Sequence, residues 1–180
     1  MLIVLISITV LCLVCLYYFN RIIILSNRIE NAWSQIDVQL KKRIDLVPNL
    51  IDTVKGYMKH EKDIIKEITK SRERMIGAKT DEERLKADKS ISAALKNIFA
   101  LAENYPDLKA NENFLMLQEE LASVENKIAY ARQFYNDSIL AYNNMVSTFP
   151  GVIFAKILGK EKRKHIEIEE KERKTVKVEF

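Results

Sequence analysis

The segment RIDLVPNLIDTVKGYMKHE, residues 43–61, contains the pattern that decides the fold of this chain. Its apolar residues fall three and four positions apart, as on one face of an α-helix: Ile44, Val47, Leu50, Ile51, Val54, Tyr57 and Met58. Pro48 interrupts the pattern, and a proline inside a helix costs about 3 kcal/mol. Because the pattern keeps its phase across Pro48, we expect one continuous, kinked helix. The alternative is a new helix with Asp45 as N-cap, which would place Pro48 in the first turn.

The same spacing continues through most of the chain and favours an all-α protein. The 180 residues include only four glycines and three prolines, which is few for a protein of many turns. Apolar periodicity predicts four helices, over about 22–58, 61–76, 81–104 and 107–147. Thr80 and Glu83 have the spacing of a capping box before the third helix. We expect an N-terminal transmembrane helix that continues into an antiparallel four-helix up-down bundle over residues 26–149.

Residues 1–25 have the composition of a membrane anchor. MLIVLISITVLCLVCLYYF, residues 1–19, is apolar except for Ser7 and Thr9, and its length matches a membrane span of about 20 residues. It has no basic n-region, and the first alanine is Ala32, so we expect a retained anchor rather than a cleaved signal peptide. Lysines and arginines follow the span and none precedes it. The positive-inside rule then predicts an external N-terminus and a cytoplasmic bundle.

Residues 150–180 form an amphipathic and charged C-terminal tail. In up-down connectivity the fourth helix returns to the bilayer, and an apolar face with adjacent basic residues suits an anionic membrane surface. The candidate membrane-surface residues are Phe149, Ile153, Phe154, Ile157, Lys160 and Arg163. The alternative is that the apolar ones cap the base of the bundle. Residues 166–180 alternate apolar and charged residues, which indicates either extended structure or a disordered tail.

Polar residues lie on or beside the apolar stripe of the fourth helix. Such residues either fix the register of packed helices or line a polar groove for a partner. The candidate seam or interaction residues are Pro48, Glu125, Asn126, Arg132, Asn136 and Asn143. In a kinked first helix Pro48 would leave the carbonyl of Ile44 without its donor, at about 1–3 kcal/mol if buried. We expect Arg132 or Asn136 to supply a donor.

The sequence contains no pattern of an active site. His60-Glu61 resembles the start of a zinc-protease helix, but no second histidine follows four residues later. Cys12 and Cys15 lie in the apolar segment, and the scattered glycines form no phosphate loop. We therefore expect no enzymatic activity, no cofactor and no metal. The formal charge of +4, without a basic run interleaved with aromatic residues, predicts no nucleic-acid partner.

Three stretches that follow the apolar segment resemble the LemA family of bacterial membrane-anchored proteins. They are RIENAWSQIDVQLKKRIDLVPNLIDTVKGYMKHE (28–61), YPDLKANENFLMLQEELASVENKIAYARQFYNDSILAYNN (105–144) and TFP (148–150). The resemblance implies an antiparallel helical bundle with no known enzymatic activity. It also implies a membrane context, since such genes often lie beside those of membrane-bound metalloproteases and a relative takes part in magnetosome membrane formation. The charged tail departs from the family pattern.

These observations predict a single-pass protein of the bacterial inner membrane. We expect a non-enzymatic helical scaffold or adaptor that binds another membrane protein, such as a membrane protease, through its cytoplasmic bundle. The alternative is a self-assembling protein, a homo-oligomer that organises or remodels the membrane. Exposed apolar residues left over after the core is filled would favour the alternative.

Overall fold

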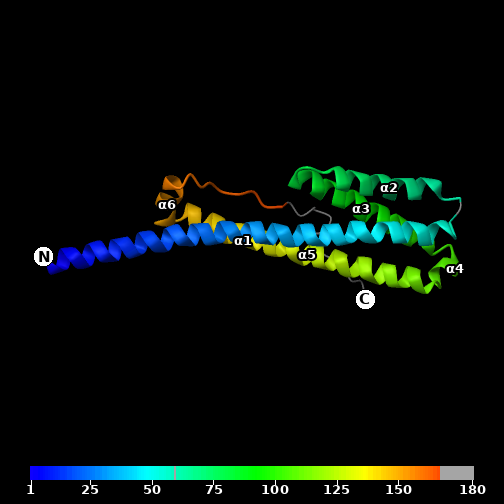
Figure 1. Ribbon diagram of the computed structural model, residues 1–180, viewed down its shortest axis with the longest axis horizontal. Helices are drawn as coiled ribbons and strands as arrows, with labels where there is room; N and C mark the ends of the chain where they lie inside the picture. The colour runs from blue at the N-terminus through cyan, green and yellow to red at the C-terminus, as the bar shows by residue number, and fades with distance from the viewer. Residues whose placement is uncertain (59, 167–180) are drawn as a thin grey trace, which may run out of the picture. The chain divides into compact units, whose positions relative to one another are not determined.

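The computed structural model describes residues 1–58 and 60–166 (Figure 1). Within these ranges every regular element is an α-helix, so the all-α class is confirmed. The helices are α1 (Leu2–Lys55), α2 (Lys62–Gly77), α3 (Asp81–Ala102), α4 (Pro106–Lys109), α5 (Glu112–Ser147) and α6 (Gly151–Ile157). The extended structure considered for the end of the tail falls almost entirely on residues 167–180, which lie outside the described residues.

Helix α1 runs without a break through Pro48, as the apolar pattern predicted. The alternative, a new helix capped by Asp45, is wrong. Val47 and Leu50, on either side of the proline, are fully buried. Burying such a side chain contributes roughly 1.5–3 kcal/mol, so the two together offset the cost of about 3 kcal/mol for an internal proline.

The N-terminal part of α1 is long and apolar enough to cross a membrane. An 18-residue window of this helix has a mean hydropathy of 2.7, and none of that window is buried. Burial begins at Ile22 and recurs at Leu25 and Ile29. Apolar residues of α1 are therefore not buried before Ile22 and are recurrently buried from Ile22 onward, and the end of the anchor at residue 25 stays a prediction.

The chain forms two compact units, and the helices α1 and α5 each contribute residues to both of them. Unit 1 consists of Met1–Gln35 together with the chain from Tyr130 onward. Its core brings together α1, α5 and α6 through Ile22, Leu25, Ile29, Ile139, Tyr142, Val146 and Ala155. After α6 the chain continues as an extended segment, drawn in orange in Figure 1, which runs back along α5.

Unit 2 consists of Ile36–Ala129 and contains α2, α3 and α4 with the adjoining parts of α1 and α5. Helix α2 packs against α3, and the rings of Phe99 on α3 and Phe114 on α5 meet edge to face with centroids 6.0 Å apart. The predicted capping box of α3 is confirmed. The Glu83 amide donates to Thr80 Oγ1 at 3.2 Å, and the Glu83 carboxylate accepts from the Thr80 amide.

The fourth helix does not begin at residue 107, and this prediction was wrong. Pro106–Lys109 forms the separate single turn α4, and α5 begins at Glu112. Asn111 accounts for the break, because its Oδ1 accepts a hydrogen bond from the Phe114 amide at 3.0 Å. This is the bond that an asparagine N-cap makes to the third residue of a new helix.

Candidate functional site

Helix α5 carries two groups of polar contacts, one in each unit. The group in unit 2 is centred on Arg43 of α1, whose side chain is fully buried. Arg43 forms ion pairs with Asp88 on α3 and Glu125 on α5, and donates a hydrogen bond to Ser92 Oγ at 2.8 Å. We call these four residues the Arg43 cluster. Since each of three helices supplies at least one member, the cluster ties α1, α3 and α5 together in one register.

A buried ion pair is expensive to desolvate, but removing one partner is more damaging still, at about 3–5 kcal/mol. The Arg43 cluster therefore rejects packing registers that would separate Arg43 from its carboxylates. Glu125 was a candidate from the sequence, whereas Arg43 and Asp88 were missed. Arg43 stands between Leu40 and Val47 on the apolar stripe of α1, and a charge at such a position was the available signal.

The group in unit 1 holds the segment that follows α6. Asn143 donates through Nδ2 to the carbonyl of Arg163 at 2.8 Å, and its Oδ1 accepts from the Arg163 amide at 2.9 Å. Asn136 makes the same pair of bonds with Ile166, at 3.1 and 2.9 Å. Two asparagine side chains thus hold the backbone of two residues of the tail. Asn136 and Asn143 were both candidate interaction residues from the sequence, but their shared target, the backbone of the tail, was not predicted.

The Arg163 side chain is bound by the same face of unit 1. Its Nη2 donates to Ser26 Oγ at 3.0 Å and lies 3.8 Å from Glu30 Oε1. Its guanidinium also lies over the Tyr142 ring, 5.5 Å from the centroid. We call Ser26, Glu30, Asn136, Tyr142 and Asn143 the tail clamp. It binds backbone through its asparagines and a basic side chain through its other members.

Helix α6 packs closely on the rest of unit 1 at one face. A Cβ added to Gly151 would lie 2.1 Å from the carbonyl oxygen of Met145, so only glycine permits this approach. Ala155 is buried, and the Phe154 ring stacks on Tyr18 of α1 with centroids 5.4 Å apart. Tyr18 belongs to the aromatic edge of the predicted anchor.

The opposite face of α6 leaves large apolar side chains in solvent. On α6, Ile153 and Ile157 are 48% and 74% exposed, and Phe149, two residues before the helix begins, is 82% exposed. Lys156 is also exposed, and Lys160 is half-buried just beyond the helix. The predicted membrane-surface residues therefore divide between an outward apolar stripe, which we call the α6 stripe (Phe149, Ile153, Ile157), and the inward-facing Phe154.

The remaining predicted residues differ in burial. Asn126 is exposed, and Pro48 and Arg132 are half-buried. Asn136 bonds to Ile166 through both its Oδ1 and its Nδ2, and the donor expected for the backbone opened by Pro48 stays a prediction.

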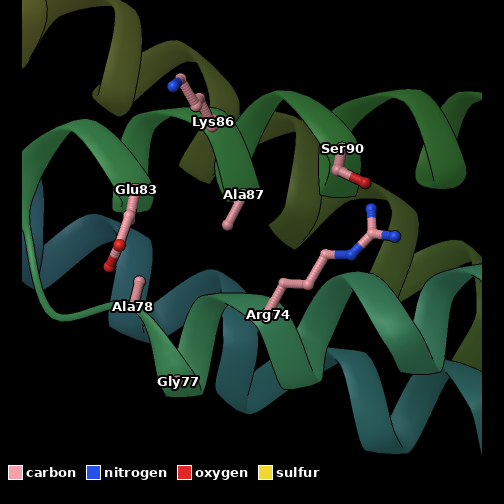
Figure 2. Close-up of a pocket in the computed structure, with 7 residues that line it drawn as sticks. All are labelled: Arg74, Gly77, Ala78, Glu83, Lys86, Ala87 and Ser90. Atoms are coloured by element: carbon pink, nitrogen blue, oxygen red, sulfur yellow. The ribbon is translucent and has the colours of Figure 1, made fainter.

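A surface hollow between α2 and α3 contains several charged side chains, but they do not converge (Figure 2). Figure 2 shows Arg74 extending toward Ser90 while Lys86 points away. The Glu83 carboxylate is engaged by the backbone amides of Lys79 and Thr80, which hold its pKa below the ordinary glutamate value. The hollow lies beside the turn between α2 and α3, and its charged side chains do not point to one position where a ligand could bind.

Within the His60-Glu61 pair, Glu61 has a structural role. Glu61 precedes α2 and accepts a hydrogen bond from Tyr105 Oη at 3.1 Å, and this bond raises the pKa of Tyr105. Among the described residues no group of three or more histidine, cysteine, aspartate or glutamate side chains could hold a metal ion.

Comparisons with known proteins point to one family. The model of the LemA family matches residues 32–180. The chain is 32% identical over 127 residues to protein LemA of Metamycoplasma hominis, a match that covers 68% of this chain and 57% of that protein. It is 29% identical over 75 residues to the magnetosome protein MamQ of Magnetospirillum gryphiswaldense, covering 42% of this chain and 28% of MamQ. The chain thus spans little more than half the length of the first relative.

Proposed function

Since this chain belongs to the LemA family, we propose that it is a membrane-anchored, non-enzymatic scaffold that binds another membrane protein. In this proposal residues 1–25 cross the bacterial inner membrane once, with the N-terminus outside. Residues 26–149 form a cytoplasmic, antiparallel four-helix up-down bundle that binds the partner, for example a membrane protease. Residues 150–180 form the tail.

The continuity of α1 carries this proposal. One helix of 54 residues contains both the exposed apolar window and the buried positions of the folded units. At 1.5 Å per residue it is about 81 Å long. No loop separates the apolar anchor from the packed part of this helix. A partner bound to the packed part would therefore be held at a restricted distance and direction from the anchor, as a scaffold requires.

In the second candidate function, copies of this chain assemble on the membrane and organise it. The observation in its favour is a set of large apolar side chains of α5 that remain exposed: Leu115, Met116, Tyr130 and Leu140. Exposed apolar side chains that form a contiguous area commonly mark interaction sites. The same side chains would serve a different membrane protein equally well, so the two functions must be separated by experiment.

Photo-crosslinking in living cells separates them. A photoreactive amino acid at Met116 or Tyr130, both exposed, should give discrete adducts that remain in membranes after alkaline extraction and contain a second, integral membrane protein. The matched control places the same group at Lys96, an exposed charged position of α3. Adducts of twice the chain's own mass would support self-assembly instead. If adducts at both positions are no stronger than at Lys96, neither function uses this face of α5.

A further inference from the structure

We propose that the tail clamp is a binding site for an extended, arginine-containing peptide segment of a partner protein, and that residues 163–166 occupy it as an intramolecular stand-in. This inference rests on the scaffold function proposed above and specifies how the partner is recognised. The required ligand is an extended segment with an arginine in the position of Arg163 and free backbone groups there and three residues later.

The backbone contacts have the geometry of peptide recognition. An asparagine amide presents one carbonyl acceptor and an N–H donor side by side, so it can pair with both backbone groups of a single residue, as a neighbouring strand does. Asn136 and Asn143 each make both bonds, at 2.8–3.1 Å. Main-chain bonds of this kind provide affinity for extended peptides largely independent of sequence.

The spacing of the two asparagines matches an extended chain. They lie seven residues apart on α5, a rise of about 10.5 Å along a helix. Arg163 and Ile166 lie three residues apart, which is about 10 Å in an extended strand. Because the two lengths agree, a straight segment engages both asparagines at once, and a helical segment would be too short to do so.

The remaining residues of the tail clamp select an arginine. Ser26 accepts a hydrogen bond from the Arg163 guanidinium, Glu30 supplies the opposite charge, and Tyr142 supplies a ring face. A planar guanidinium can donate and stack at the same time, whereas the ammonium of lysine is a point charge that does this poorly. The tail clamp therefore combines backbone recognition with one specific side-chain position.

Residues 163–166 are held in the tail clamp in a way that permits a partner segment to replace them. Lys162, Lys164 and His165 are exposed, and within residues 161–166 only Arg163 and Ile166 are half-buried. A segment that served only to cover the core would bury several apolar side chains, and residues 160–165 contain none. The covalent link gives the tail a high effective concentration, so a partner segment must compete with it. Negative charge at Glu30 favours a basic competitor.

The test uses the full-length chain in nanodiscs of zwitterionic lipid, which avoids binding of a basic peptide to the bilayer. The probe is a fluorescent peptide with the sequence of residues 160–166, KEKRKHI, measured by anisotropy. Arg163→Ala weakens the covalent competitor, so this variant should bind the peptide at least tenfold more tightly than the wild-type chain. Adding Asn143→Ala to it should weaken binding at least tenfold, and a peptide with alanine in place of its arginine should not bind.

The matched control is Asn144→Ala in the same Arg163→Ala background. Asn144 is the exposed neighbour of Asn143 on α5, and its replacement should leave peptide binding unchanged. Circular dichroism verifies that each variant folds. Hydrogen exchange gives an independent readout in the wild-type chain, because the protected amides of Arg163 and Ile166 should exchange faster as unlabelled peptide is added.

Three results would overturn the proposal. The first is no binding of the peptide to the Arg163→Ala chain at millimolar concentration, and the second is equal loss of binding in the Asn143→Ala and Asn144→Ala variants. The third is a dimer that forms with increasing wild-type concentration and disappears in Asn143→Ala, which would assign the clamp to the tail of a second copy. Since all of these are measured on purified protein, they are independent of the cellular crosslinking that tests the scaffold function.

Discussion

Single charged residues in this chain have effects that depend on burial. Arg43 and the exposed lysines carry the same charge, yet Arg43 has no exposed surface and depends on Asp88, Ser92 and Glu125 for compensation. Glu83, in contrast, is exposed and acts through the backbone amides that precede α3. A buried charge is therefore expected to affect the whole unit, and an exposed one only its own helix end.

Replacing Asp88 by alanine should destabilise the protein strongly. The change removes the more buried of the two carboxylates that pair with the Arg43 guanidinium, because Glu125 is 55% exposed. We expect a loss of about 3 kcal/mol, the lower end of the range for breaking a buried pair, measured by chemical denaturation in detergent. The control Lys96→Ala removes an exposed charge from the same helix and should change stability by less than about 0.5 kcal/mol.

The double change Arg43→Met with Asp88→Leu should recover much of the stability lost in Asp88→Ala. If the double variant is no more stable than Asp88→Ala, the buried charge is not the cause of the loss.

Glu83 should make the stability of α3 depend on pH in acid. Backbone amides of Lys79 and Thr80 lower its pKa in the folded state, so its contribution is present above the ordinary glutamate pKa of about 4.3. The contribution is lost as pH falls through the lowered folded pKa. The melting temperature of wild type should therefore exceed that of Glu83→Gln at pH 7, and the two should converge toward pH 3. A difference that stays constant from pH 7 to pH 3 would contradict this.

At the scale of elements, α6 and the turns beside it decide where the C-terminal segment goes. Gly151 allows α6 to begin against the carbonyl of Met145. Gly159 ends the helix with a φ of 61°, and the amide of Lys160 bonds to the carbonyl of Ala155 at 2.9 Å. This is the pattern of a Schellman motif, which favours glycine at the left-handed position. The two glycines together direct residues 160–166 back along α5 to the tail clamp.

Adding one methyl group at Gly151 should disrupt this arrangement. The new Cβ would lie 2.1 Å from a backbone oxygen, so Gly151→Ala must move the backbone, at about 1–3 kcal/mol. Gly77→Ala is the control, because a Cβ there meets nothing within 4 Å and α2 should gain slightly from the better helix former. Thermal melts of both variants compare the effects. Equal melting temperatures would mean that α6 can shift without consequence.

The α6 stripe should contact lipid. Its two isoleucines lie on α6, whose Phe154 ring stacks on Tyr18 at the aromatic edge of the apolar helix. Such an amphipathic segment with nearby lysines suits a membrane interface. Tryptophan at Ile157 should be quenched by brominated lipid in nanodiscs. Tryptophan at Ile76, an exposed apolar position of α2, should be quenched less, and the native Trp33 is common to both. Equal quenching would mean that the stripe is no closer to lipid than α2.

At the scale of the whole molecule, the distribution of charge relates the chain to the membrane. The apolar window at the start of α1 contains no lysine or arginine, and basic residues begin at Arg21. Positive charge is retained on the cytoplasmic side of a span. The direction of insertion therefore depends on the residues that follow the window rather than on any packing inside the folded units.

A reporter fused to the C-terminus should accordingly be active in the cytoplasm. A fusion enzyme that works only outside the inner membrane should be inactive at the same position, and the two are measured in parallel. Replacing Arg21 and Arg28 by glutamine reduces the charge bias near the span and should lower the cytoplasmic signal. Digestion of the C-terminal segment by protease added to intact spheroplasts would reverse the proposed orientation.

The amino-acid sequence by itself determined the features that depend on neighbouring residues. Helical class follows from apolar spacing, the start of α3 from Thr80 and Glu83, and the continuity of α1 from an unbroken stripe on both sides of Pro48. The family could also be recognised from its motifs. One local signal was missed: Asn111, three residues before Phe114, is the N-cap that begins α5.

Only the tertiary structure decided which polar residues meet. Arg43 and Asp88 are separated by 45 residues, and Asn143 and Arg163 by 20. The pattern placed Asn136 and Asn143 beside a helical stripe, but a side chain with one donor and one acceptor group can pair with many targets. Which target it meets depends on the glycine turns around α6: Gly151 allows close approach to the Met145 carbonyl, and Gly159 adopts a positive φ. Periodicity identifies the face of a helix, while packing selects the partner of each residue on it.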